Sequence, residues 1–358
     1  MRGVVLVAIA LLGCGKNQTA SPDAEAPGDS VADSPLDTAI DTPIDTAVLP
    51  PDVTPDAPLP SMCTAPATLV DVSPRRIANF VRSGSTLYTS VFAFDGVNAT
   101  DAAVLAIDTA TGAIAPSPLL TSTPAAVFAV GDDVLVVEFL GGTISRIHPG
   151  DPPSVLITNR VRPRAATADE EFLYWTEENP AGPADFVRRR LLAGGPIEDL
   201  MTCENSFRLL LVGTELYCAG RRLQHVPKTG AAQSTQVTNP IEGFFIPTLI
   251  EDAGTIYFAN SEANHSTLFE VGAGDIAVKL HQLTGFGRPT GIVAAPAFIY
   301  MVDEDSGLWR VDRTTHVAEH LINTVSLGGT PVRFNGEFYL QASTPTSSGE
   351  PLIVHCLE

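Results

Sequence analysis

The sequence predicts an all-β protein, a seven-bladed β-propeller, from a short repeated pair of residues, the spacing of that pair and the strands expected around it. An apolar residue followed by tyrosine or leucine recurs with its second member at positions 88, 135, 174, 217, 257, 300 and 339. The intervals of 39–47 residues match propeller blades, which are four-stranded sheets of about 40–50 residues. Seven pairs therefore predict seven blades.

One blade can be laid out strand by strand around Tyr300. Its expected strands cover 288–293, 297–302, 307–312 and 316–322, and the segments between them are rich in Gly, Asp, Ser and Thr. A proline is expected to open the first strand in six of the seven blades, because its missing N–H is not needed there. These prolines are Pro74, Pro124, Pro163, Pro247, Pro289 and Pro331.

The two ends of the domain are expected to meet in one blade. The last blade has a third strand at 352–357 and no fourth, whereas a spare strand at 67–72 precedes the first blade. An N-terminal strand that completes the last blade closes the ring and removes the exposed edges of an open array.

Residues 1–13 are expected to be a lipoprotein signal peptide. The apolar run from Gly3 to Leu12 is too short to span a bilayer and fits the core of an export signal. Leu11-Leu12-Gly13-Cys14 resembles the bacterial lipobox, which implies lipidation of Cys14; the alternative is an ordinary signal peptide with an incidental cysteine. Gly15 stands where enteric lipoproteins of the inner membrane carry Asp, so the analogy implies the outer membrane, on its periplasmic or cell-surface side.

Residues 14–62 are predicted to be a disordered, lipid-anchored linker rich in acidic residues, Pro and Thr, and residues 63–358 to be the propeller. The linker repeats Asp-Thr at 37, 41 and 45 and carries too few apolar side chains to offset the entropy lost on folding. The lipid is then the only expected contact with the membrane.

Four further cysteines, an even number in an exported domain, predict two disulfides. Ring closure would bring Cys63, ahead of the borrowed strand, to Cys356 at the end of the last third strand. Cys203 would then bond Cys218, and the expected register requires Cys203 to fold back from a loop above the strand. Reactive thiols are the alternative.

The candidate binding site is a ring of arginines at one mouth of the central channel. Guanidinium groups suit bidentate recognition of carboxylate or phosphate. The alternative is that they pair with nearby acids such as Glu204 and Glu242 and only join blades. The ring consists of arginines within two residues of a blade-opening proline, with two phenylalanines in the same class of loop: Arg75, Arg76, Arg162, Arg164, Arg288, Arg333, Phe244 and Phe286.

Motifs for catalysis, a cofactor or a metal are not recognisable in the sequence. His316 and His320 are four residues apart, but a strand separates such residues by roughly 13 Å, too far for one metal ion. The net charge of −20 argues against nucleic acid, because phosphate binding needs a basic surface. We expect a monomer without cofactor or metal.

Residues 63–358 resemble the seven-bladed propellers of bacterial envelope proteins. Tyr-Trp-Thr-Glu at 174–177 is similar to the Tyr-Trp-Thr-Asp repeats of receptor propellers and, more broadly, to NHL and TolB-like propeller repeats. Receptor propellers of that type have six blades and carry the full motif in more than one, so the resemblance implies architecture only. A binding or scaffold module for an envelope protein or an anionic glycan is the expected function. The alternatives are a hydrolase or lyase with a central-channel site and a purely structural role in an outer-membrane assembly.

Overall fold

The computed structural model describes residues 67–71, 76–94, 99–120, 125–149, 151–230, 233–237, 245–261, 265–284, 288–304, 307–322, 326–334, 337–343 and 351–357. All of them belong to the second of two units into which the chain divides, residues 57–358. The predicted signal peptide, Cys14 and the predicted linker lie outside the described residues.

The described part of the chain contains no helix with the length and hydropathy that crossing a membrane requires.

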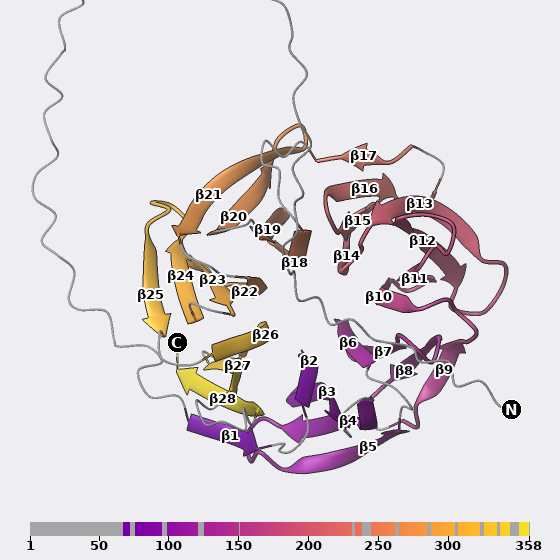
Figure 1. The fold of residues 1–358 in the computed structure, drawn as a ribbon, viewed down its shortest axis with the longest axis horizontal. Helices are drawn as coiled ribbons and strands as arrows, with labels where there is room; N and C mark the ends of the chain where they lie inside the picture. Colours follow the sequence, from indigo (N-terminus) through magenta and orange to yellow (C-terminus); the bar gives the residue numbers. More distant parts are fainter. Residues whose placement is uncertain are drawn as a thin grey trace, which may run out of the picture. The chain divides into compact units, whose positions relative to one another are not determined.

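The described strands form seven antiparallel sheets of four strands each (Figure 1). The first two sheets are β2 (Arg76–Ser83), β3 (Thr86–Phe94), β4 (Ala99–Asp108) and β5 (Ile114–Leu120), then β6 (Ala125–Val130), β7 (Asp133–Glu138), β8 (Thr143–Ile147) and β9 (Ser154–Ile157). The next two are β10 (Pro163–Ala168), β11 (Phe172–Glu177), β12 (Ala184–Leu191) and β13 (Glu198–Glu204), then β14 (Arg208–Val212), β15 (Glu215–Ala219), β16 (Leu223–Pro227) and β17 (Thr235–Gln236).

The remaining three sheets follow the same plan, with one change at the end. They contain β18 (Phe245–Asp252), β19 (Thr255–Ser261), β20 (His265–Gly272) and β21 (Ile276–Thr284), then β22 (Pro289–Ala294), β23 (Phe298–Asp303), β24 (Gly307–Asp312) and β25 (Ala318–Ile322). The last sheet has β26 (Ser326–Phe334), β27 (Glu337–Ser343) and β28 (Pro351–Leu357), and its fourth strand is β1 (Ala67–Asp71), which pairs with β28.

The first strands of the sheets contact one another in a closed order. The contacts run from β2 through β6, β10, β14, β18 and β22 to β26, and β26 in turn contacts β2. The sheets therefore stand around a common axis, as Figure 1 shows, and this arrangement is a β-propeller. The prediction of an all-β propeller is confirmed.

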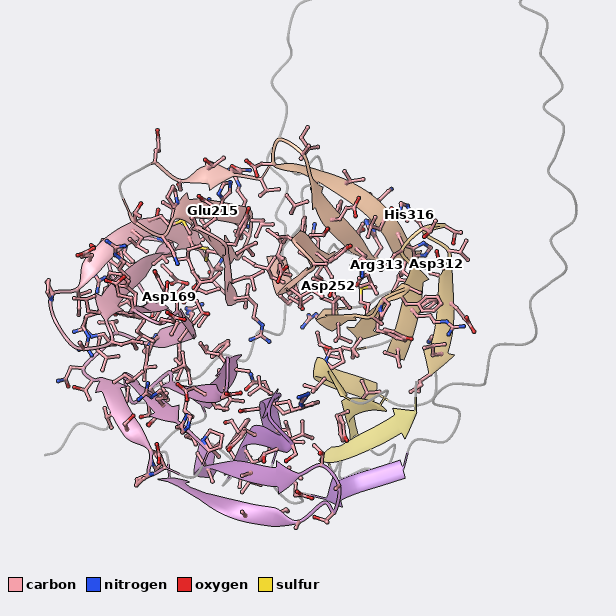
Figure 2. All side chains as sticks on the ribbon, turned by 180° about the vertical axis from the view of Figure 1, so that it is seen from behind. Asp169, Glu215, Asp252, Asp312, Arg313 and His316 are labelled. Atoms are coloured by element: carbon pink, nitrogen blue, oxygen red, sulfur yellow. A yellow bond between two sulfur atoms is a disulfide. The ribbon has the colours of Figure 1, made fainter. Side chains whose placement is uncertain are left out.

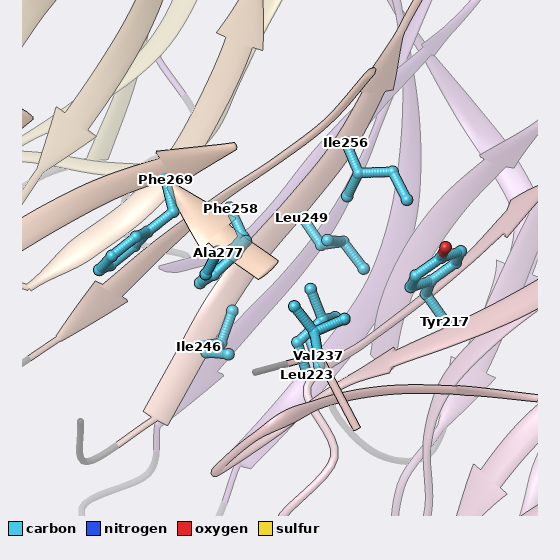
Figure 3. Packing of buried hydrophobic residues seen from close by; sticks show 10 residues of the cluster. Tyr217, Leu223, Val237, Ile246, Leu249, Ile256, Phe258, Phe269 and Ala277 are labelled. Carbon is cyan, nitrogen blue, oxygen red and sulfur yellow. The ribbon is translucent and has the colours of Figure 1, made fainter. Parts of the chain in front are cut away.

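The core lies between neighbouring sheets, because each sheet is covered on both faces. β11 shows this directly: all of its residues from Leu173 to Glu177 are buried. Between the sheets β14–β17 and β18–β21, Tyr217 and Leu223 pack against Ile246, Leu249 and Phe258 (Figure 3). Burying one large apolar side chain contributes roughly 1.5–3 kcal/mol, so these layers supply most of the stabilisation.

Prolines open only some of the first strands. Pro163 and Pro289 are the first residues of β10 and β22, as predicted. The prediction is wrong for Pro247, which lies within β18, and for Pro331, which lies within β26 next to Val332, the residue opposite Tyr339. The register of this strand shifts between Gly328 and Val332, and similar irregularities interrupt β2, β10, β18 and β22. A bulge inserts unpaired residues, so the distance from proline to hairpin differs among the sheets.

A polar contact joins neighbouring sheets at equivalent positions, next to the hairpins that connect first and second strands. Arg313 of the sheet β22–β25 donates to the Asp252 carboxylate at 2.6 Å and to the Tyr257 hydroxyl at 2.7 Å, both in the preceding sheet (Figure 2). In the sheets before these, the Lys228 ammonium lies 3.0 Å from the Asp169 carboxylate. In each case one cation of a sheet pairs with an acid of the preceding part of the propeller.

The turn between β24 and β25 explains why the fourth strand begins later than predicted. The Asp312 carboxylate accepts hydrogen bonds from the backbone N–H groups of Thr314 at 2.9 Å and Thr315 at 2.7 Å. His316 follows with φ 59°, a left-handed conformation that does not continue a strand. The predicted strand 316–322 therefore begins at Ala318. Hydrogen bonds from Thr315 and Thr314 hold the pKa of Asp312 below its usual range.

Candidate functional site

The predicted site lies where the first strands begin. The backbone N–H of Glu178, just after β11, donates to the carbonyl of Val161, just before β10, at 2.9 Å. The N–H of Glu304 makes the corresponding bond to the carbonyl of Arg288, also at 2.9 Å. The segments leading into first strands thus lie beside the connections from second to third strands. We call this side of the propeller the loop face.

Two of the predicted arginines come together on the loop face and share one aromatic ring. The guanidinium carbons of Arg162 and Arg164 lie 5.7 and 5.6 Å from the centroid of the Phe139 ring. Arg162 has φ 45°, in the left-handed region that few residues other than glycine adopt. Cation–π stacking of this kind holds a guanidinium plane in place and contributes about 0.5–1 kcal/mol at an exposed position.

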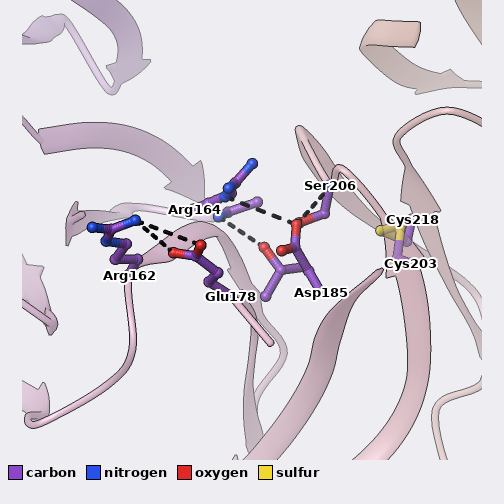
Figure 4. A network of polar contacts seen from close by, with 9 residues as sticks. Arg162, Arg164, Glu178, Asp185, Cys203, Ser206 and Cys218 are labelled. Carbon is purple, nitrogen blue, oxygen red and sulfur yellow. Dashed lines mark hydrogen bonds and ion pairs between the residues drawn. A yellow bond between two sulfur atoms is a disulfide. The ribbon is translucent and has the colours of Figure 1, made fainter. Parts of the chain in front are cut away.

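Both of these arginines also have a carboxylate of the same chain nearby (Figure 4). The Arg162 guanidinium lies 3.1 Å from Glu178, and the two side chains are 49% and 30% exposed. Arg164 Nε lies 3.9 Å from the buried carboxylate of Asp185. Pairing with an acid was the alternative interpretation of the arginines, although it named Glu204 and Glu242. The exposed pair of Arg162 contributes little and leaves its outer edge open to solvent.

Asp185 connects this network to the next sheet. Its Oδ2 accepts hydrogen bonds from the backbone N–H of Ser206 at 2.9 Å and from the Ser206 hydroxyl at 2.7 Å, and both residues are buried. Ser206 precedes β14, so Asp185 on β12 fixes the segment that leads into the following first strand. Phe207 comes next, 38% exposed, with its ring 5.5 Å from that of Phe245.

The remaining predicted site residues are placed only in part. Arg288 is exposed, one residue before Pro289, and it occupies in the sheet β22–β25 the position that Arg162 occupies in β10–β13, three sheets earlier. Arg76 and Arg333 belong to β2 and β26, but their side chains lie outside the description. Arg333 is opposite Phe338, next to the β26–β27 hairpin, so the prediction that it lies with Arg162 and Arg288 is wrong. Arg75, Phe244 and Phe286 lie outside the described residues.

Arg208 was missed by the search for arginines next to prolines. It begins β14, the first strand of the sheet for which no opening proline was predicted, and stands opposite Ala219. Its guanidinium carbon lies 5.5 Å from the centroid of the Phe128 ring, which belongs to β6 two sheets away. The side chain therefore reaches toward the axis, and burial lowers its pKa. Counting back from the Gly213-Thr214 hairpin would have identified it.

Two more arginines of the loop face follow β15. Arg221 and Arg222 are both exposed. The N–H of Arg221 donates to the carbonyl of Glu204 at 2.8 Å, and Arg222 donates to the side chain of Gln236 at 3.1 Å. Among the described residues, Arg221 has no carboxylate partner.

The predicted disulfide between Cys203 and Cys218 is confirmed, and it lies beside the network in Figure 4. Both residues are buried. Cys218 is opposite Leu209, as predicted. Cys203, however, lies in strand β13 rather than in a loop, so the bond joins the outer strand of one sheet to the second strand of the next. The predicted Cys63–Cys356 bond involves residues whose side chains lie outside the description, and it stays a prediction.

Two observations bear on metal binding and on the channel. In the part of the chain that the structure describes, His, Cys, Asp and Glu side chains form no group of three or more suited to a metal ion. His320 instead stacks on Trp309 at 4.1 Å.

A cavity of about 470 Å³ opens where the first strands end, on the side away from the loop face, with Arg82, Ser83 and Asp132 among its polar lining residues.

The comparisons with known proteins support the fold. Neither a protein-family model nor a curated protein sequence matches the chain. Among solved structures, a catalytically inactive virginiamycin B lyase from Staphylococcus aureus with quinupristin has a TM-score of 0.62 and 12% identity, over 81% of this chain and 98% of that one. An oligogalacturonate lyase in complex with manganese has a TM-score of 0.57 and 11% identity, over 82% of this chain and 96% of that one.

A third similar structure is apo AztD from Citrobacter koseri. Its TM-score is 0.53 at 16% identity, and the match covers 78% of this chain and 90% of that one. At this level of identity these likenesses define a class of architecture, the β-propeller, and carry no activity over to this chain.

Proposed function

We propose that this protein is a binding or scaffold module that recognises an anionic partner, an envelope protein or an acidic glycan, through the loop face of its propeller. One observation carries the proposal: Arg162 and Arg164 are held on one aromatic ring on the loop face, in a chain whose net charge is −20. Oriented guanidinium groups recognise carboxylates and phosphates. A local basic site also attracts anions when the net charge of the whole molecule is negative.

We propose further that the seven sheets are seven blades of one ring, which the N-terminal strand closes. The support is the closed order of contacts among the first strands and the pairing of β1 with β28, in which Ala67 is opposite His355 and Asp71 opposite Leu352. A bond between Cys63 and Cys356 would then stand in place of the hairpin that this sheet lacks.

The loop-face proposal is tested by replacing Arg162 and Arg288 together with alanine. We expect the affinity for polygalacturonate or polyglutamate to fall by about tenfold or more, because each loss of about 1.4 kcal/mol is a factor of ten. Wild-type affinity should also fall with added salt, since exposed charges are screened within about 8–10 Å. The measurement is titration calorimetry of the full chain in detergent at two salt concentrations.

Arg146→Ala is the matched control for this double variant. Arg146 lies on β8 with its guanidinium 3.6 Å from Asp133, and its side chain is 41% exposed. It should bind both polymers as the wild type does. An unchanged affinity of the double variant for a polymer that the wild type binds would refute the proposal.

We propose that the module is exported and lipid-anchored to the bacterial outer membrane, on the strength of Leu11-Leu12-Gly13-Cys14 and Gly15. Cys14→Ser should release the protein from washed membranes into the soluble fraction, because stable anchoring needs acyl chains on that cysteine. Gly15→Asp should instead move the anchored protein to the inner-membrane fraction of an enteric host. Retention of the Cys14→Ser variant after a carbonate wash rules the anchor out.

A second candidate is a propeller hydrolase or lyase acting in the channel. The cavity of about 470 Å³ beside Arg82, Ser83 and Asp132 is the observation that favours it. If the full chain turns over a substrate and the Ser83→Ala variant does not, the result would support this alternative over the binding module.

A further inference from the structure

The exposed apolar side chains of the propeller are not spread evenly. Nine large ones are exposed among the described residues. Six belong to outer strands or to the residue just before one: Ile114, Val155, Ile197, Ile276, Val278 and Val317. The other three, Leu140 (50%), Val161 (44%) and Phe207 (38%), lie on the loop face, in three different connections. We call these three residues the apolar patch.

Contacts already described lie next to the members of the apolar patch. Leu140 follows Phe139, the ring on which Arg162 and Arg164 stack. Val161 precedes Arg162, and its carbonyl is fixed by the N–H of Glu178. Leu140 and Val161 therefore lie on the loop face next to residues of the arginine network.

The same network reaches the third member of the patch. Arg164 approaches Asp185, and Asp185 holds Ser206, the residue before Phe207. Phe207 also contacts Phe245. Its own N–H donates to the carbonyl of Ala219 at 2.8 Å, which places it beside the connection that carries Arg221 and Arg222. Exposed apolar side chains and arginines thus share the connections of the loop face.

This composition defines the kind of partner. Apolar and aromatic side chains next to arginines are typical of the centres of protein–protein interfaces. A polyanion bound by charge alone would gain nothing from Leu140 or Val161, which offer no hydrogen bond. The carboxylates of a partner would meet Arg221 and the open edge of Arg162, while its own apolar side chains would cover the patch.

We propose that the loop face binds a segment of a partner protein in which acidic residues alternate with apolar ones. This inference rests on the proposed function of the loop face and selects a protein over a glycan as its ligand. The apolar patch selects a protein over a glycan, and Arg162 and Arg221 attract the acidic residues of that protein.

Two peptides of equal length and equal net charge test the proposal, together with polygalacturonate. One peptide alternates Glu with Leu and Phe, and the other alternates Glu with Ser. The full chain in detergent should bind the Leu/Phe peptide about tenfold more tightly than the Ser peptide, because burial of one well-placed apolar side chain supplies about this factor. Leu140→Ser and Phe207→Ser should each remove most of this advantage, and Arg221→Ala should weaken both peptides.

Val155→Ser is the matched control, because Val155 is 61% exposed on the outer strand β9. It should keep the full advantage of the Leu/Phe peptide. Equal binding of the two peptides, or an equal effect of Val155→Ser and Phe207→Ser, overturns the proposal. If polygalacturonate binds more tightly than both peptides and loses affinity in the Arg162/Arg288 double variant, the proposed function stands and the protein partner is wrong. If none of the three probes binds, both proposals fall.

Discussion

Replacing Trp175 by alanine is expected to lower the free energy of unfolding by about 3–5 kcal/mol, the usual cost of removing a large aromatic side chain from a core. Trp175 is completely buried between the sheets β6–β9 and β10–β13, where it packs with Leu135, Ile144 and Ile157. Its indole N–H also donates to the Glu177 carboxylate at 2.9 Å. The variant therefore leaves a cavity and takes a donor from a buried acid. Urea unfolding followed by far-ultraviolet circular dichroism measures the loss.

Trp309→Ala is the matched control, because the chain has only two tryptophans. Trp309 is half-buried and stacks on His320 near the outer strand β25. Its removal leaves a space that solvent can fill, so the loss should be clearly smaller. Equal losses of unfolding free energy in the two variants would contradict the prediction. They would mean that the side chains around Trp175 can move to fill the cavity that its removal leaves.

Replacing Cys203 and Cys218 together by alanine is expected to cost about 3 kcal/mol, the chain-entropy value for a closed loop of about 15 residues. The two cysteines are 15 residues apart in sequence and join β13 to β15. Without the bond, the unfolded chain gains freedom in that loop, while the folded sheets keep their other contacts. The measurement is the same urea unfolding under non-reducing conditions.

Unfolding with and without reductant distinguishes the contribution of the Cys203–Cys218 bond to stability from that of the predicted Cys63–Cys356 bond. In the wild type, reductant removes every disulfide. In the Cys203→Ala/Cys218→Ala variant, any further loss on reduction reports the bond expected between Cys63 and Cys356. A double variant as stable as the wild type would show that the cross-link contributes nothing to the folded state, and no further loss on reduction would argue against ring closure by a second bond.

The fold could be predicted from the sequence because its signal repeats. Each second strand carries the same pair, and the buried side chains on both faces of strands such as β11 make that pair strongly apolar. The third strand of the blade around Tyr300 was predicted at 307–312, which are the bounds of β24. The fourth strand was less well predicted, since His316 and Val317, which were assigned to it, bond the backbone of Asp312 in the turn.

The candidate site was harder to predict, because its placement depends on register rather than on composition. Proline was used as the marker of a strand's beginning, but bulges change the distance between proline and hairpin. Arg333 was therefore assigned to the wrong end of its strand, and Arg208 was missed because β14 has no proline. The acids that pair with Arg162 and Arg164 come from β12 and from the segment after β11, and no local pattern relates them to the arginines.

The short outer strand β17 affects where the protein opens locally and exchanges its amide hydrogens. Among the described residues, Thr235 and Gln236 form the strand that pairs with β16, and both are exposed. The N–H of Val237 adds one hydrogen bond to the carbonyl of Leu223 at 2.9 Å, so few bonds hold the outer edge of β16. Amide hydrogens exchange through local openings, and such openings are cheapest where few bonds must break. In a hydrogen–deuterium exchange experiment, the amides of β16 and β17 should therefore be among the first to exchange. The Cys203–Cys218 bond fastens β15 to β13 one strand further in, so the opening should stop at β16 as long as the cysteines stay oxidised.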